Sequence, residues 1–147
     1  MRIIGSLLVI FLLMGFQSRN FYLEKKGREE SWRLWAQTAV EKDNHKKLKE
    51  IKMVIYRKGE EFLLNAREGE IYEERICFEE GEINFWEGLV LKGEKFVFQE
   101  EPGWLVLDGP FFIKGEGWKL KGKRGEIDLE NKIVYVREGA EWYKVDD

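Results

Sequence analysis

The chain has 147 residues, of which 44% are hydrophobic, 14% aromatic and 36% charged, and its formal net charge is −3. This length allows one domain plus a short additional segment, with enough apolar residues for a core. Lysine and glutamate are mixed along the chain, whereas nucleic-acid-binding proteins carry a basic stripe, so we expect no nucleic-acid partner. The single cysteine, Cys77, excludes an intrachain disulfide.

The first segment of the chain is apolar, and Ser6 is the one polar side chain in residues 3–16. A cleaved signal peptide has an apolar region of this kind, whereas a membrane-spanning helix needs about 20 residues. Extending the segment through residue 23 reaches that length, and no Ala-x-Ala cleavage pattern follows it. We therefore favour an uncleaved membrane anchor over residues 1–23, followed by a linker over residues 24–31.

From residue 32 onward, short apolar stretches alternate with glycine or with charged turns. Turn signals recur about every ten residues or less, which predicts an all-β domain over residues 32–147. The candidate strands, in chain order, are residues 31–38, 49–56, 61–66, 70–73, 76–78, 83–86, 89–92, 95–99, 104–107, 111–114, 118–121, 126–129, 132–136 and 141–145.

One sequence pattern occurs twice in this domain. Residues 62–71 read aromatic-x-Leu-x-small-x-x-Gly-Glu-Ile, and residues 118–127 read the same way. A weaker start of the pattern lies at residues 32–36, which favours a strand there, although the apolar spacing over residues 32–40 also fits a helix. Repeated strand–turn–strand units predict stacked hairpins, and a hairpin needs neighbours to bury its apolar face. The pattern thus favours a binding groove over a catalytic scaffold.

Alternation within the repeat assigns its side chains to one inner surface. We predict that this surface is an apolar groove formed by Phe62, Leu64, Trp118, Leu120, Ile127 and Leu129, with Phe78, Phe112 and Val134 as neighbours. Gly69 and Gly125 occupy the same position of the repeat, and we predict a positive φ or a bulge at both. Several strands are apolar on both faces, which indicates either a second cover, such as a lipid or a partner, or a crowded core.

Residues 109–122 read Gly-Pro-Phe-Phe-Ile-Lys-Gly-Glu-Gly-Trp-Lys-Leu-Lys-Gly, and they are followed by Gly-Glu-Ile-Asp-Leu at residues 125–129 and by Val134. This segment resembles the carboxy-terminal half of the LptC family, the membrane-anchored periplasmic components of lipopolysaccharide export. The apolar amino terminus and the repeated units also resemble that family, and the motifs correspond over about residues 60–140. The soluble bridge protein and the amino-terminal part of the outer-membrane translocon use the same repeat.

The resemblance implies an all-β fold, a twisted β-jelly roll made as an open roll of antiparallel strands, with an N-terminal transmembrane helix. It implies a single-pass protein of the inner membrane with its domain in the periplasm. That domain would hold the acyl chains of lipopolysaccharide and pass the lipid from an inner-membrane ABC transporter to a soluble periplasmic bridge protein of the same fold. We place the partner-docking edge on the last strands, where it includes Val134, Val136, Trp142 and Tyr143.

Two other classes of function stay open from the sequence alone. Adjacent acidic pairs such as Glu79 and Glu80 could serve an enzyme, but neighbouring residues of a strand point to opposite faces, so we expect no enzyme, and no catalytic residue, cofactor or metal site. The alternative to lipid transport is a secreted or envelope structural domain with a dry core that acts in assembly or adhesion.

Overall fold

The computed structural model describes residues 18–28, 30–86, 88–99 and 103–145. Every secondary-structure element in these residues is a β-strand, so the all-β class predicted from the sequence is confirmed. In chain order the strands are β1 (Ser18–Lys26), β2 (Glu30–Lys42), β3 (His45–Arg57), β4 (Glu60–Ile71), β5 (Arg75–Phe85), β6 (Leu89–Gln99), β7 (Trp104–Gly115), β8 (Trp118–Asp128), β9 (Ile133–Glu138) and β10 (Glu141–Lys144).

The strands form one antiparallel sheet in which each strand pairs with the next along the chain as far as β8. β7 pairs with β8 over its whole length. On the other side of β8, β9 pairs with residues 124–128 and β10 pairs with residues 118–121. β9 and β10 are therefore two segments of one sheet edge, separated by Gly139 and Ala140.

The sheet begins earlier in the chain than the predicted domain boundary. Residues 18–26, expected in the anchor and the linker, form β1 and pair with β2. Phe21 and Leu23 are buried and alternate with partly exposed residues, as in a strand with one face on a core. The rest of the predicted anchor, residues 1–17, lies outside the described residues. Within the described ranges, no helix has the length and apolarity to cross a membrane.

Each long strand bends near its middle, and this explains why the sequence suggested more and shorter strands. β4 to β8 each combine two of the expected strands. At the bend of β3, Leu48 and Ile51 are buried, while Lys49 and Glu50 between them are both exposed. Two consecutive side chains thus face outward, and the alternation then starts again. The charged stretches that look like turns in the sequence are bends within continuous strands.

A positive φ recurs along this line of bends, at Asn20, Glu50, Glu80, Gly109 and Gly139, which are 30, 30, 29 and 30 residues apart. The first four lie on β1, β3, β5 and β7, and the last lies between β9 and β10. Every second strand therefore contains one residue with a positive φ at its bend. An irregular residue of this kind bends a strand and increases its local twist. We call this line of bends the corner.

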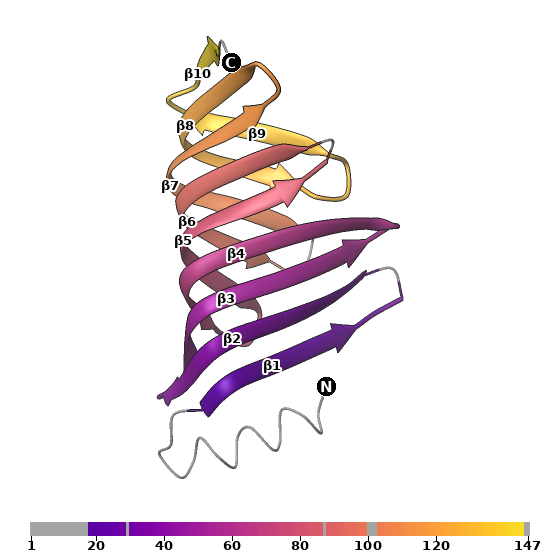
Figure 1. The fold of residues 1–147 in the computed structure, drawn as a ribbon, viewed down its shortest axis with the longest axis vertical. Helices are drawn as coiled ribbons and strands as arrows, with labels where there is room; N and C mark the ends of the chain where they lie inside the picture. The colour runs from indigo at the N-terminus through magenta and orange to yellow at the C-terminus, as the bar shows by residue number, and fades with distance from the viewer. Residues whose placement is uncertain (1–17, 29, 87, 100–102, 146–147) are drawn as a thin grey trace.

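The corner divides the sheet into two leaves. Figure 1 shows the long strands crossing the front of the molecule and bending round to continue behind it. Leaf 1 consists of the described residues of 21–36, 51–66, 81–93, 111–122 and 141–144, and leaf 2 consists of those of 38–49, 68–79, 95–108 and 124–138. One hydrophobic cluster lies between the leaves and takes residues from both. This is the open roll of antiparallel strands that the sequence analysis expected.

The repeat has glycine at residues 69 and 125 because a side chain would not fit there, not because the backbone needs an unusual dihedral angle. Gly69 and Gly125 have no positive φ, so that part of the prediction is wrong, and a register shift lies beside Gly125 only. A Cβ on Gly69 would lie 2.8 Å from the carbonyl oxygen of Cys77, and a Cβ on Gly125 would lie 2.5 Å from the carbonyl oxygen of Tyr135. Both distances are shorter than any real contact, so these positions exclude a side chain.

Candidate functional site

The interior between the leaves contains most of the residues predicted to form an apolar groove. Five of them are buried members of the core, with at most 2% of their surface exposed: Phe62, Leu64, Phe78, Ile127 and Leu129. Trp118, Leu120 and Val134 are partly buried and pack against this core. They lie on β8 and β9, so the interior is less completely covered near the carboxy-terminal end of the roll.

Phe112 lies apart from the other predicted groove residues. Its neighbours Phe111 and Ile113 are in the core, so Phe112 points to the opposite face of β7. There the Nζ of Lys119 lies 3.9 Å from the centre of its ring. Residues 111, 112 and 113 are all apolar, so the sequence pattern does not show which of them face the interior, and Phe112 was assigned to the wrong face.

The two leaves are not joined by a backbone hydrogen-bond ladder. In the described residues, Cα atoms of two strands come within 8 Å only where the strands are neighbours in the sheet. Away from the corner, where the strands themselves pass from one leaf to the other, side chains alone hold leaf 1 against leaf 2. A roll built in this way can separate its leaves without breaking any strand pairing.

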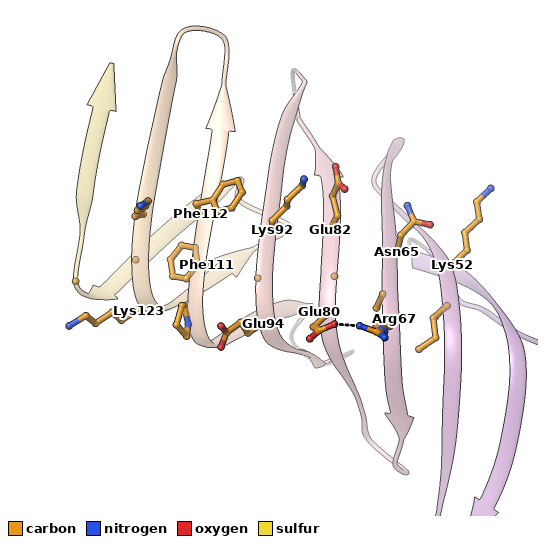
Figure 2. A pocket seen from close by; sticks show the side chains of 18 of the residues that line it. Lys52, Asn65, Arg67, Glu80, Glu82, Lys92, Glu94, Phe111, Phe112 and Lys123 are labelled. Carbon is orange, nitrogen blue, oxygen red and sulfur yellow. Dashed lines mark hydrogen bonds and ion pairs between the residues drawn. The ribbon is translucent and has the colours of Figure 1, made fainter. Parts of the chain in front are cut away.

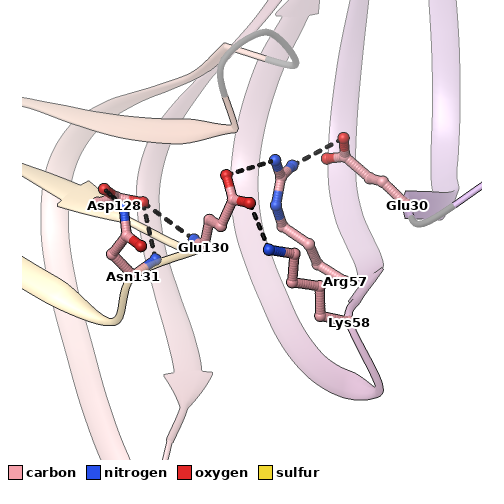
Figure 3. Close-up of polar contacts among 6 residues, drawn as sticks. All are labelled: Glu30, Arg57, Lys58, Asp128, Glu130 and Asn131. Carbon is pink, nitrogen blue, oxygen red and sulfur yellow. Dashed lines mark hydrogen bonds and ion pairs between the residues drawn. The ribbon is translucent and has the colours of Figure 1, made fainter.

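A group of ion pairs closes the roll on the side opposite the corner (Figure 3). Nη2 of Arg57, at the end of β3, lies 3.6 Å from Oε2 of Glu130, which follows β8. Glu130 also pairs with Lys58, and Lys132 pairs with Glu60. We call these five residues the ionic clasp. It joins the β3–β4 turn of leaf 1 to the β8–β9 turn of leaf 2.

Both ends of the clasp are held by polar contacts within their own leaf. Nη1 of Arg57 lies 2.8 Å from Oε2 of Glu30, and the Arg57 side chain is only 13% exposed. In the other leaf, buried Asp128 accepts hydrogen bonds from the backbone N–H groups of Glu130 and Asn131, both at 3.0 Å, and from the Asn131 side chain (Figure 3). These contacts order the β8–β9 turn and so fix the position of Glu130.

The same contacts set the pKa values of the two acidic groups. Burial raises the pKa of Asp128, but the hydrogen bonds from Asn131 and Glu130 outweigh it, with help from the Arg57 charge, and the net pKa is below its ordinary value. The pKa of Glu130 is also lowered, mainly by its hydrogen bond and charge interaction with Lys58. Both carboxylates are therefore stabilised in the charged form that the clasp uses.

An open groove of about 1020 Å³ follows the corner and was not predicted from the sequence. Its floor includes residues with little or no side chain, such as Ala66, Gly81, Gly93 and Gly122. Figure 2 shows the flanking side chains in two rows, Lys52, Asn65, Glu82, Lys92 and Phe112 on one side and Arg67, Glu80, Glu94 and Lys123 on the other. Small residues with charged neighbours, recurring in successive strands, are the sequence signal that could have revealed it.

The predicted docking edge lies at the carboxy-terminal end of the sheet. Val134 and Val136 on β9 pack against the core, whereas all residues of β10 are exposed. Trp142 is 64% exposed and Tyr143 38%. A strand edge with exposed aromatic side chains is a suitable surface for pairing with another strand.

Two chemical features of the described residues bear on catalysis. Cys77 is on β5 between the core residues Ile76 and Phe78, so it faces away from the core, and partial burial raises the pKa of its thiol. Nε2 of His45 lies 3.4 Å from a carboxylate oxygen of Glu70. Within the described part of the chain, no three His, Cys, Asp or Glu side chains are grouped to hold a metal ion.

No protein-family model and no curated protein matches the sequence. Among solved structures, the chain is similar to the crystal structure of LptH, the LptA homologous periplasmic component of the conserved lipopolysaccharide transport device from Pseudomonas aeruginosa. The two chains share a fold. The TM-score is 0.58, with 15% sequence identity over 76% of this chain and 93% of LptH. The LptH fold agrees with the open jelly roll expected from the sequence.

Proposed function

We propose that this chain is a non-catalytic module of lipopolysaccharide transport, which holds acyl chains between its two leaves and passes the lipid to a neighbouring module. The observation that carries the proposal is the fold. The chain shares its fold with LptH, a component of a lipopolysaccharide transport device, and in this chain the fold is one sheet whose leaves enclose a continuous apolar interior.

The proposal extends to the place of the module in the envelope. Its domain would lie in the periplasm, and residues 1–17 would contain the anchor in the inner membrane. The module would receive lipopolysaccharide from an inner-membrane ABC transporter and pass it to a soluble periplasmic bridge protein of the same fold, which would pair with the β9–β10 edge. The LptC-like motifs at residues 109–129 and the exposed aromatic residues of β10 support this position.

Acyl chains can enter only if the leaves separate, because the interior is filled by side chains such as Leu34, Met53 and Phe62, which have 0% exposure. Each buried methylene group would contribute about 0.8 kcal/mol. Separation about the corner breaks no strand pairing, since no strand of one leaf pairs with a facing strand of the other in the described residues. The gain from several methylene groups can therefore offset the loss of core contacts.

Photocrosslinking in cells that make lipopolysaccharide tests the proposal. A photoreactive phenylalanine analogue replaces Phe62 or Phe78 inside the roll, and Tyr56, which is 37% exposed, is the matched control. We expect lipopolysaccharide adducts at the two interior positions and none at Tyr56. Equal yields at all three positions, or no adduct at either interior position, would contradict lipid binding between the leaves.

The second candidate is an envelope structural module with a dry core, and the complete burial of the central side chains favours it. The domain purified without detergent distinguishes the two functions. Phosphate and fatty-acid analysis should find bound lipid if the module transports it, and the dry-core alternative predicts none.

A further inference from the structure

The ionic clasp differs from the other ion pairs of the molecule in what it joins. Where both partners are described, the remaining pairs lie within one strand or between strands that are neighbours in the sheet, such as Arg67 with Glu80. The pairs of Glu130 with Arg57 and Lys58, and of Lys132 with Glu60, instead join turns of opposite leaves. The clasp therefore restrains the distance between the leaves directly.

The core begins immediately behind the clasp. Leu129, which precedes Glu130, is 2% exposed, and Ile55, two residues before Arg57, is 1% exposed. Leu129 donates its backbone N–H to the carbonyl oxygen of Gly103 in its own leaf. Opening the clasp would thus uncover the apolar interior while leaving each leaf internally hydrogen-bonded.

A second feature on the same side shows that the leaves are already incompletely sealed. A cavity of about 100 Å³ lies between Leu23 and Trp32 of leaf 1 and Ile76 and Phe98 of leaf 2, and charged residues including Lys25 also line it. The two leaves therefore leave a small space between them on the side opposite the corner. The clasp closes the part of this side that lies nearer the carboxy-terminal end.

We infer that the ionic clasp is the latch of a side entrance to the roll, so that an acyl chain enters between the β3–β4 and β8–β9 turns when Glu130 separates from Arg57 and Lys58 and Lys132 separates from Glu60. This inference rests on the proposed function, because it takes the interior as the acyl site. Lys58 and Lys132 are 49% and 53% exposed, and ion pairs with such exposure are individually weak. Arg57, held by Glu30, stays in place and re-forms the clasp.

A reversible covalent lock tests the latch. Lys58→Cys and Glu130→Cys are combined with Cys77→Ser, and the two new thiols are joined by a short linker that contains a disulfide. Uptake of the fluorescent fatty acid 11-(dansylamino)undecanoic acid is then measured before and after reduction of the linker. The linker holds the β3–β4 and β8–β9 turns together, so the fatty acid cannot enter between them. Because association slows when binding depends on a restricted conformational change, we expect uptake to be on the order of tenfold slower in the locked form.

The matched control joins Arg67→Cys to Glu80→Cys in the same way. These residues form an exposed pair between neighbouring strands β4 and β5, so this lock should leave the rate of uptake unchanged. Equal uptake by the locked and reduced forms of the Lys58–Glu130 variant would overturn the side entrance. Equal slowing by both locks would also overturn it, because the effect would then not depend on the clasp.

A measurement without ligand separates the latch from the proposed function. Spin labels at Glu61→Cys on leaf 1 and Ile133→Cys on leaf 2, with Cys77→Ser, report the separation of the leaves. Glu130→Lys places a third positive charge beside Arg57 and Lys58, and we expect it to shift the distance distribution to longer values. An unchanged distribution would overturn the latch. If the distances lengthen but no variant binds the fatty acid, the result supports the clasp as the contact that holds the leaves together and contradicts the proposed lipid site.

Discussion

At the level of single residues, alternation placed most interior side chains correctly and failed where the pattern was ambiguous. Ile127 and Leu129 alternate with acidic neighbours, and both are buried. Phe112 stands between two other apolar residues, so its face could not be read from the pattern. The roles of Glu130 and Arg57 could not be predicted either, because a contact between residues so far apart in the sequence depends on how the leaves are folded together.

The lowered pKa of Asp128 leads to a prediction about stability and pH. Because its pKa is lower in the folded protein than its ordinary value of 3.8, ionised Asp128 stabilises the folded state at neutral pH, and this contribution is lost as the pH falls through the folded pKa. Asp128→Asn should lower stability by about 1 kcal/mol at neutral pH, since hydrogen bonds to a charged group are stronger than neutral ones.

The measurement is the thermal midpoint of both proteins from about pH 7 to about pH 2.5, a range that spans the titration of a carboxyl group. We expect the difference between wild type and Asp128→Asn to shrink at the acidic end. Asp108→Asn, at an exposed position on β7, is the control and should show a smaller difference throughout. A difference that stays constant with pH would mean that the Asp128 charge does not stabilise the fold.

At the level of elements, the sequence predicted that the domain is made of antiparallel strands but not how long they are. The bends contain charged residues and glycines, as turns do, so each long strand was divided in two. A turn reverses the direction of the chain, whereas at these bends the strand continues. Two consecutive side chains face outward at the bend, as Lys49 and Glu50 do on β3, and the alternation then resumes. β1 was missed because its alternation follows directly on the apolar segment assigned to the anchor.

The glycines beside the corner supply a prediction about packing. A Cβ on Gly81 would lie 2.5 Å from Cζ of Phe96 and 2.8 Å from the carbonyl oxygen of Asn65, whereas the nearest atom to a Cβ on Gly93 is a Phe96 carbon at 3.3 Å. Gly81→Ala should therefore cost about 1–3 kcal/mol of stability through overpacking, and Gly93→Ala distinctly less. Urea unfolding measures both, and a Gly81→Ala protein as stable as wild type would contradict this role for Phe96.

At the level of the whole molecule, the fold class was predictable because the repeat implies stacked hairpins, and hairpins need a common core. The corner was not predictable, since it is a property of all strands together. The predicted docking edge corresponds to the last segments of the sheet. β10 is exposed, and among the described strands it pairs with β8 alone.

Removing residues 140–147 tests this edge. Because β10 contributes no buried side chain, we expect the β circular-dichroism spectrum to be retained and the thermal midpoint to change little. Binding to a bridge protein of the same fold should be lost in a pull-down assay. Substituting Trp35, which is exposed on β2, should leave binding intact. Loss of folded structure on deletion would show instead that β10 belongs to the stable core.

The even spacing of positive φ along the corner has a consequence for how such a protein can change its length. Asn20, Glu50 and Glu80 are separated by 30 residues each, so one interval contains two strands and one bend of each. Duplicating residues 51–80 in tandem should add a complete unit and lengthen the molecule by about 10 Å, since neighbouring strands are about 4.8 Å apart. Small-angle X-ray scattering would detect the longer particle. The architecture is thus modular, and gene duplication could extend or shorten it without redesigning either leaf.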